Sequence, residues 1–311
     1  MNNKEKNFVS AVIYVHNAEQ HIEKFLKTII ETMLNNFEHS EIICVNDDST
    51  DNSVNIIKKV SREIAELSIS VINMSCFHGL ELAMNAGMDL SIGDFVFQFD
   101  TSILDFNHDE IMRVYHRALE GYDIVSASSD AKERLSSKLF YKAFNLFSNQ
   151  PYSMSTESFR VLSRRVINKI SSMNNTVPYR KAVYANCGLN TDNLKYHACK
   201  FVSKKTDKKE KSYKSGLAIE SLILFTEVGY RLSIIMTLLM TAVSIFMVIY
   251  SIIIYMTSSP VEGWTTTILF LSVAFGGLFG ILTIIIKYLQ LLVDLVFKRK
   301  NYSYESIEKL K

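Results

Sequence analysis

The sequence predicts an α/β fold: a Rossmann-like, mostly parallel sheet with helices on both faces, followed by juxtamembrane helices and a two-helix transmembrane hairpin. Two observations support this prediction. Over residues 1–230, short apolar runs rich in β-branched residues alternate with segments of helical spacing, as in sheets buried on both faces. Beyond residue 231 lie two long uncharged stretches, each long enough to cross a bilayer.

The predicted elements alternate along the chain. Short apolar runs bounded by polar turns predict strands at residues 9–15, 41–46, 69–73, 95–100 and 124–128. Apolar side chains spaced three and four residues apart predict helices at residues 18–33, from the turn after residue 51 to about 66, and at 79–90 and 109–119. In such a sheet, ligands bind at the carboxyl ends of strands, where the strand order switches.

The charge distribution predicts that the two apolar stretches span a membrane. Thirty uncharged residues separate Arg231 from Glu262, and 24 separate Glu262 from Lys287. Basic residues flank the outer ends, whereas the connecting loop carries only Glu262, so the positive-inside rule places both ends in the cytoplasm. We expect a cytoplasmic domain at 1–215, an amphipathic juxtamembrane helix at 216–231, spans at 232–257 and 265–293, and a cytoplasmic tail at 294–311.

The composition excludes several other classes of protein. With 34 basic and 32 acidic residues, the formal net charge is +2, which excludes a protein that wraps nucleic acid. The polar first residues predict that no signal peptide is present. The cysteines form neither a zinc pattern nor a disulfide framework, and we interpret them as buried thiols in a reducing compartment: Cys44, Cys76, Cys187 and Cys199.

Acidic side chains follow two of the predicted strands. Asp47 and Asp48 come after the strand at 41–46, and Asp100 ends the strand at 95–100. Carboxylates there can accept hydrogen bonds from a nucleotide or hold a divalent cation against a diphosphate. Acidic, Ser/Thr-rich turns are also good turns and helix caps, and for Thr50 and Asp51 both interpretations remain open.

Taken in order, these segments resemble the family 2 glycosyltransferases of the GT-A fold, and specifically the polyprenyl-phosphate sugar transferases. Residues 12–22 and 45–53 resemble the two nucleotide-binding turns, and residues 79–94 resemble the helix before the metal-binding strand. The acceptor side and the juxtamembrane helix are represented by residues 135–148, 157–167 and 218–233. Two terminal spans are the bacterial arrangement of this family.

The resemblance implies a set of site residues. Nucleotide-sugar contacts are expected from Tyr14, His16, Asn17, Glu19, Val45, Asp47, Asp48, Asp100, Thr101 and Ser102. Catalytic roles are implied for Asp100, Asp105 and Arg160, and Mg²⁺ or Mn²⁺ is expected at Asp100 and Ser102. Contacts to the lipid phosphate or the diphosphate are expected from Lys132, Arg134, Lys138, Lys204 and Lys205.

The departures from the family pattern fall at the chemistry. Ser102 stands where the family has the second metal-binding aspartate, Leu104 where it has glutamine, and Ser158 where it has a further aspartate. We therefore expect a weak metal site. A non-catalytic relative that acts as a membrane scaffold or regulatory subunit remains the alternative. A processive polysaccharide synthase is excluded, because no Gln-x-x-Arg-Trp motif is present.

The activity implied is an inverting transfer of a hexosyl or N-acetylhexosaminyl group from a nucleotide sugar, expected to be a UDP-sugar, to undecaprenyl or another polyprenyl phosphate. It would serve cell-envelope glycans from the cytoplasmic side of the cell membrane, in a homo-oligomer such as the family's tetramers. Residues 195–214 contain eight lysines and two acids. This segment is either a solvated loop or a loop that attracts anionic headgroups. Three histidines without metal spacing are interpreted as structural or substrate-adjacent: His16, His78 and His197.

Overall fold

The structure is a computed structural model that describes residues 4–64, 66–130, 135–147, 156–172, 179–198, 208–225 and 304–309, with scattered positions between 235 and 292. The chain divides into two compact units. The first contains residues 1–145, 150–218 and 299–311, and the second contains residues 146–149 and 219–298. Each unit is described by itself.

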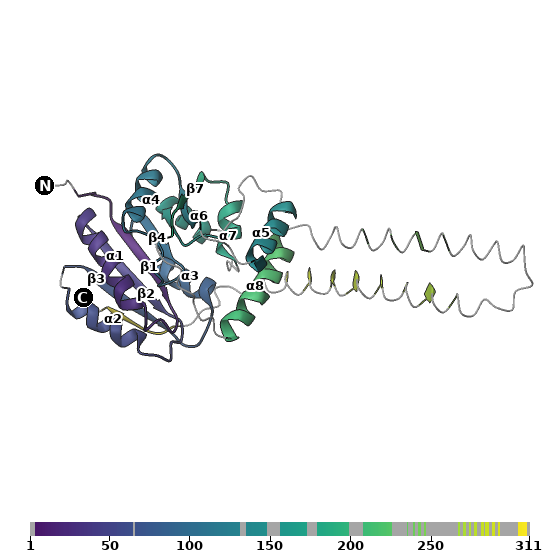
Figure 1. Cartoon of the computed structure of the whole chain (residues 1–311), viewed down its shortest axis with the longest axis horizontal. Helices are drawn as coiled ribbons and strands as arrows, with labels where there is room; N and C mark the ends of the chain where they lie inside the picture. The colour runs from purple at the N-terminus through teal and green to yellow at the C-terminus, as the bar shows by residue number, and fades with distance from the viewer. Residues whose placement is uncertain are drawn as a thin grey trace, which may run out of the picture. The chain divides into compact units, whose positions relative to one another are not determined.

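The first unit is built on an eight-stranded mixed sheet (Figure 1), with the order β7-β5-β6-β4-β1-β2-β3-β8. Four of its seven pairings are parallel: β1 with β2, β1 with β4, β2 with β3, and β5 with β7. The strands are β1 (Val9–Val15), β2 (Ser40–Asn46), β3 (Ser68–Met74), β4 (Phe95–Phe99), β5 (Ile124–Ser129), β6 (Phe159–Ser163), β7 (Thr191–Tyr196) and β8 (Tyr304–Lys309). The prediction of an α/β sheet with helices is confirmed, but the sheet is mixed, because β6 pairs antiparallel with β4 and β5, and β8 pairs antiparallel with β3.

Helices cover both faces of this sheet, and β1 shows why. Its residues Val9, Ala11, Ile13 and Val15 pack with α1 (Ile22–Asn36), α2 (Ser53–Arg62) and α4 (Asp109–Leu119) on one face. The alternate residues Val12 and Tyr14 pack with α3 (Leu80–Leu90), α6 (Arg164–Ser172) and α7 (Arg180–Asn186) on the other. Successive side chains of a strand point to opposite faces. A continuous apolar run such as β1 is therefore buried on both faces of the sheet.

Several predicted boundaries shift for local reasons. The first helix begins at Ile22 rather than residue 18, because residues 18–21 form a turn that is closed by a hydrogen bond from His21 N to the Ala18 carbonyl oxygen at 2.9 Å. The strand predicted at 95–100 ends at Phe99, which leaves Asp100 just past it. The expectation of a loop over residues 195–214 is wrong at both ends, since β7 runs to Tyr196 and α8 (Lys208–Phe225) begins within it.

Two cysteines match their interpretation and one does not. Cys44 and Cys187 are buried, and burial raises the pKa of the Cys44 thiol to about 12. Cys76 is exposed, because it lies in the irregular segment between β3 and α3. Cys199 lies outside the described residues.

The second unit is described only at scattered positions. Those positions are helical, and several of their large apolar side chains are exposed, among them Leu271, Leu278, Leu282, Ile285, Leu289 and Leu292. Within the described part of the chain, no helix is long and apolar enough to cross a membrane. The spans expected at 232–257 and 265–293 lie mostly outside the described residues, so they remain a prediction.

Candidate active site

The predicted site lies at the carboxyl ends of three neighbouring parallel strands, β4, β1 and β2. Tyr14 is near the end of β1, Asp47 follows β2, and Asp100 follows β4. Because β2 lies on one side of β1 and β4 on the other, this is the switch in strand order where doubly wound sheets bind ligands. The two acidic strand ends therefore meet at one edge of the sheet.

The turns after β1 and β2 are hydrogen-bonded to each other. Asn17 N donates to Ser49 Oγ at 3.1 Å, and Thr50 N donates to Asn17 Oδ1 at 2.9 Å. Glu19 joins the same unit, since its side chain accepts a hydrogen bond from Asn52 N. Asn17 and Asp48 both adopt a left-handed backbone, with φ of 47° and 54°. The predicted nucleotide contacts Asn17, Glu19 and Asp48 therefore lie in one pair of interlocked turns.

Asp47 is fully buried and is held by neutral donors. Its Oδ2 accepts from Tyr14 Oη at 2.9 Å and from Gly79 N at 2.9 Å, while its Oδ1 accepts from His78 N at 2.8 Å. His16 Nδ1 lies 2.6 Å from the Asp47 carbonyl oxygen. The carboxylate thus fixes the segment before α3 against the ends of β1 and β2.

Gly79 and the aromatic side chains near it bring helix α8 to this edge. Gly79 has φ of 85° and ψ of 164°, a backbone region occupied essentially only by glycine. A Cβ there would lie 2.2 Å from Tyr213 Cζ of α8. Tyr213 also makes an edge contact with Phe77, at 6.0 Å between ring centroids. Burial raises the pKa of the Tyr213 hydroxyl.

A hollow of about 120 Å³ lies between α8 and the strand ends. It is smaller than the roughly 300–1,000 Å³ of typical ligand pockets. Three predicted nucleotide contacts line it: Tyr14 of β1, and Asp100 and Thr101, which follow β4. The remaining lining residues are Phe77, Leu80, Tyr213, Lys214 and Leu217.

Asp100 is bound by two guanidinium groups, one on each carboxylate oxygen. Arg160 Nη2 donates to Asp100 Oδ2 at 2.9 Å, and Arg180 Nη2 donates to Asp100 Oδ1 at 2.8 Å. Both arginine side chains are 1% exposed, and that of Asp100 is 12% exposed. Burial alone would raise the pKa of Asp100, but the charges of Arg180 and Arg160 lower it to about 2.

Both arginines are anchored by further groups. Arg180 donates to Glu81 Oε2 from Nε at 2.8 Å and from its backbone N at 2.9 Å. Arg160 Nη2 lies 3.1 Å from Glu157 Oε2, and Gln98 Oε1 accepts from Arg180 at 3.3 Å and from Arg160 at 3.4 Å. Burial alone would lower the pKa of Arg180, but Glu81 and Asp100 raise it above its usual value. Side chains from α3, β4, β6 and α7 thus converge on one buried charged cluster.

Ser102 and Asp105 do not complete a metal site with Asp100. Ser102 is buried and offers a neutral hydroxyl. Asp105 Oδ1 accepts from Tyr196 Oη at 3.0 Å, and burial raises the pKa of Asp105 despite that bond. Within the described residues, no three His, Cys, Asp or Glu side chains are grouped as metal ligands. With both Asp100 oxygens bound by arginines, these residues do not fit a resident divalent cation.

The other predicted residues lie apart from this cluster or outside the description. Val45 is in the core beneath α3, where a Cβ at Gly87 would lie 2.7 Å from its Cγ2. Lys138 is exposed on α5 (Leu135–Phe147). His197 pairs with Asp130. Four predicted phosphate contacts lie outside the described residues: Lys132, Arg134, Lys204 and Lys205.

Sequence reasoning missed several side chains in or beside the charged cluster, among them Glu157, the ion-pair partner of Arg160. Gln98 was detectable as a polar residue within the apolar run 95–99, and Glu81 as an acid on the buried side of α3. Arg180 and Lys181 gave no signal, because no periodic pattern surrounds them. Lys181 is near the cluster, where Tyr141 and Glu157 raise the pKa of its ammonium group against the effect of burial.

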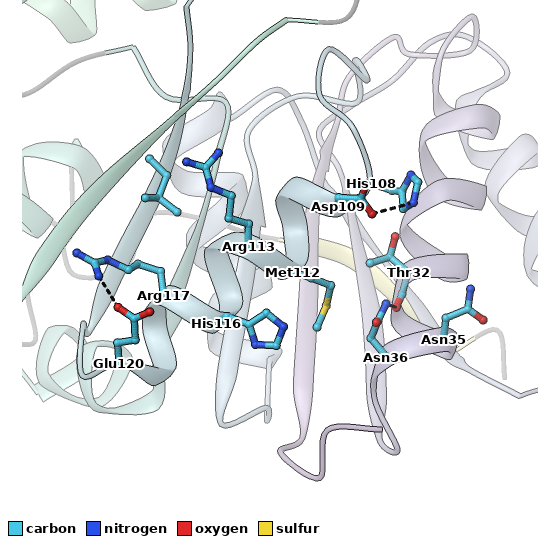
Figure 2. Close-up of a pocket in the computed structure, with 11 residues that line it drawn as sticks. Thr32, Asn35, Asn36, His108, Asp109, Met112, Arg113, His116, Arg117 and Glu120 are labelled. Atoms are coloured by element: carbon cyan, nitrogen blue, oxygen red, sulfur yellow. Dashed lines mark hydrogen bonds and ion pairs between the residues drawn. The ribbon is translucent and has the colours of Figure 1, made fainter. Parts of the chain in front are cut away.

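A larger hollow of about 790 Å³ lies elsewhere, between the C-terminal part of α1 and one side of α4 (Figure 2). Its walls are polar side chains such as Asn35, Asn36 and His116. Figure 2 shows the ion pair between Arg117 and Glu120 at its rim. None of the predicted site residues lines it, so the candidate active site remains the edge formed by β4, β1 and β2.

The sheet order resembles the GT-A fold of solved glycosyltransferases. A solved mannosyltransferase from Pyrobaculum calidifontis, in complex with GDP-Man and Mn²⁺, matches 70% of this chain and 63% of its own, with a TM-score of 0.50 and 13% identity. At this identity the likeness shows the fold alone.

Residues 10–171 match the family described as Glycosyl transferase family 2. Since this match covers more than half of the chain, the chain belongs to that family and is a glycosyltransferase.

Relatives align over different shares of the chain. The glycosyltransferase YkcC of Bacillus subtilis, described as uncharacterized, is 22% identical over 96% of this chain and 95% of its own. A prophage bactoprenol glucosyl transferase homolog of Escherichia coli is 28% identical over 72% of this chain and 74% of its own. An uncharacterized glycosyltransferase of Synechocystis is 27% identical, and the match spans 57% of each chain.

Proposed function

We propose that this enzyme transfers a sugar from a nucleotide sugar to a polyprenyl phosphate. The E. coli relative is named for bactoprenol glucosyl transfer. A Shewanella sediminis relative, 30% identical over 45% of this chain and 43% of its own, is named an undecaprenyl-phosphate 4-deoxy-4-formamido-L-arabinose transferase. The observation that carries the proposal is the hollow where Asp100 and Thr101 lie opposite Tyr213, Lys214 and Leu217 of α8, the helix that precedes the apolar stretches.

The proposed reaction needs little help from a general base. A phosphate monoester has a second pKa of about 6, so the acceptor is largely a dianion at neutral pH. One of its oxygens forms a bond to the anomeric carbon as the bond from that carbon to the donor's β-phosphate oxygen breaks, and the electron pair leaves with the nucleoside diphosphate. Attack opposite the leaving group inverts the anomeric configuration. Ser158, which replaces the family's aspartate, is compatible with such an acceptor.

The donor proposed is a UDP-linked hexose or N-acetylhexosamine. The interlocked turns with Asn17, Glu19 and Asp48 would receive the nucleoside, and the hollow beside Asp100 and Thr101 would receive the diphosphate and sugar. That hollow is about 120 Å³, smaller than typical ligand pockets, and the proposal therefore includes a shift of α8 when the donor binds.

A membrane hairpin with a cytoplasmic catalytic unit completes the proposal. Strand β8, which follows both apolar stretches, pairs with β3 of the same sheet. This pairing supports the proposal that both ends of the two apolar stretches lie on one side of a bilayer, as an even number of spans would require. The exposed apolar side chains of the second unit suit contact with lipid or with another copy of this chain, in line with the proposed homo-oligomer.

A scaffold or regulatory role is the second candidate. Ser102 in place of a carboxylate and the two arginines on Asp100 favour it, because both differ from a metal-binding pattern. A scaffold is expected to form no glycolipid with any donor.

The test is a transfer assay with the purified full chain, undecaprenyl phosphate and a panel of radiolabelled nucleotide sugars. A labelled lipid product that depends on the acceptor would support the proposal. Asp100→Asn should reduce product formation at least tenfold, whereas Lys27→Gln, at an exposed ion pair with Glu23, serves as the matched surface control. Absence of product with every donor would reject the transferase proposal and leave the scaffold.

A further inference from the structure

The carboxylate that would hold a cation is already neutralised by the protein. Asp100 Oδ1 and Oδ2 each accept a guanidinium N–H, at 2.8 and 2.9 Å. A divalent ion at Asp100 would have to share these oxygens with two positive charges in a site where both arginines are 1% exposed. Charge repulsion is weakly screened at such a depth, so the arrangement opposes cation binding.

The arginines are not free to move aside. If Arg180 left Asp100, its Nε hydrogen bond to Glu81 Oε2 would be disturbed, and Glu81 is itself 3% exposed. If Arg160 left, Glu157 would lose its ion pair. Removing one partner of a buried ion pair is strongly unfavourable because the other charge stays buried without compensation. The two guanidinium groups are therefore fixed parts of the site.

Arg160 keeps a guanidinium donor that no described residue occupies. Arg160 Nε is buried and has no hydrogen-bond partner among the described residues. Arginine carries five N–H groups, and those of Arg180 that donate within the described residues go to Glu81, Gln98 and Asp100. An unpaired buried donor is unfavourable, which makes it a natural contact for an anionic oxygen.

We propose that this enzyme binds the diphosphate of its donor without a resident divalent cation, and that Arg160 and Arg180 supply the positive charge instead. The inference rests on the proposed function. Negative charge grows on the leaving nucleoside diphosphate as its bond to the anomeric carbon breaks, and fixed positive groups stabilise such charge without reorganisation. The planar fork of arginine suits phosphate oxygens. The reaction consumes no co-reactant beyond donor and acceptor.

The first experiment measures UDP binding to the purified full chain by calorimetry, once with EDTA and once with Mn²⁺, while electron paramagnetic resonance counts free Mn²⁺. The expected dissociation constants differ by less than threefold, and the chain with UDP removes no Mn²⁺ from solution. Binding that is tightened tenfold or more by Mn²⁺, or one Mn²⁺ taken up per chain, would overturn the inference.

The second experiment tests the arginines. Arg180→Lys and Arg160→Lys keep the charge but lose the fork, and each should weaken UDP binding in EDTA at least tenfold. Arg113→Lys, at an exposed ion pair with Glu110, is the matched control and should leave binding unchanged. If both cluster variants bind UDP like the wild type, the arginines are only structural and the inference fails. If a variant does not fold, the comparison of EDTA and Mn²⁺ on the wild type still decides.

The outcomes separate this inference from the proposed function. If sugar transfer and UDP binding require Mn²⁺, the transferase proposal stands and the inference is wrong. If neither UDP nor GDP binds with EDTA or with Mn²⁺, and no glycolipid forms, both are wrong. Transfer that proceeds in EDTA and falls in the Arg180→Lys variant supports both.

Discussion

Two carboxylates follow the strands that flank β1 on its two sides, yet the protein holds them in different ways. Asp47, after β2, accepts hydrogen bonds from the Tyr14 hydroxyl and from two peptide N–H groups, those of His78 and Gly79. Asp100, after β4, accepts from the guanidinium groups of Arg160 and Arg180. Neutral donors hold the first carboxylate, and full charges hold the second.

The difference indicates that Asp47 and Asp100 have different roles at one site. Peptide donors at Asp47 depend on the backbone path through Gly79, so that carboxylate fixes geometry near the nucleotide turns. The arginines at Asp100 set the charge where the diphosphate is proposed to lie. Substitutions that remove a charge, and low pH, should therefore destabilise the surroundings of Asp100 after β4. Substitutions that change the backbone or remove a hydroxyl should destabilise the surroundings of Asp47 after β2.

Removing the guanidinium group of Arg180 should have the largest effect on the free energy of unfolding. Arg180→Met leaves Glu81 and Asp100 buried with one cation fewer, and breaking a buried pair costs about 3–5 kcal/mol. The measurement is the free energy of unfolding of the full chain in denaturant. Arg113→Met, in an ion pair with the arginine 50% exposed, should cost less than about 1 kcal/mol. Equal losses would mean that burial of the cluster does not govern its strength.

Protonation of Asp100 at low pH should have the second largest effect on the stability of the fold. The pKa of Asp100 is about 2 in the folded chain and about 3.9 in an unfolded one. Because the folded pKa is lowered, the stabilisation is present above pH 4 and is lost as the pH falls toward 2. It amounts to about 2–3 kcal/mol.

The measurement compares unfolding of the wild type and Asp100→Asn between pH 5 and pH 2. The wild type should lose stability more steeply, since the variant cannot take up that proton. Parallel curves would contradict the charge pairing at Asp100.

A substitution at Gly79 should have the third largest effect on stability. Gly79→Ala places a side chain at φ of 85°, which costs of the order of 1–3 kcal/mol, and its Cβ would also meet the Tyr213 ring. Gly121→Ala is the matched control, because Gly121 has φ of 102° and no atom within 4 Å of the added Cβ. Hydrogen exchange should quicken around residues 77–80 in the first variant only. Equal effects on stability would show that the Tyr213 contact adds nothing.

Local pattern predicted most of the sheet. β1 at Val9–Val15 and α4 at Asp109–Leu119 have the predicted bounds, because an apolar β-branched run and a regular helical spacing are properties of one segment. Strands β6, β7 and β8 were missed. Each joins the sheet through a partner distant in sequence, β6 between β4 and β5, β7 beside β5 and β8 beside β3.

The site was predicted only as far as its strand ends. Asp47, Asp100 and Arg160 could be named because they follow or occupy recognisable segments. Arg180, the second arginine bound to Asp100, could not be predicted, because it lies 80 positions further along the chain on the short helix α7. Which charges meet across a sheet depends on helix packing, and a string of residues does not contain those distances.

The smallest effect belongs to the Tyr14 hydroxyl, and it tests whether Asp47 is held by neutral donors. Tyr14→Phe removes one of the three hydrogen bonds to the Asp47 side chain and should cost about 1.5 kcal/mol, the lower end for a bond to a charged group. Tyr122→Phe, which loses a bond from Arg117 at a part-buried site, is the control and should cost less. UDP binding should weaken in Tyr14→Phe with no change in its dependence on Mn²⁺, because the Asp100 cluster is untouched. A shift in that dependence would mean that the two carboxylates act as one electrostatic unit and not as two.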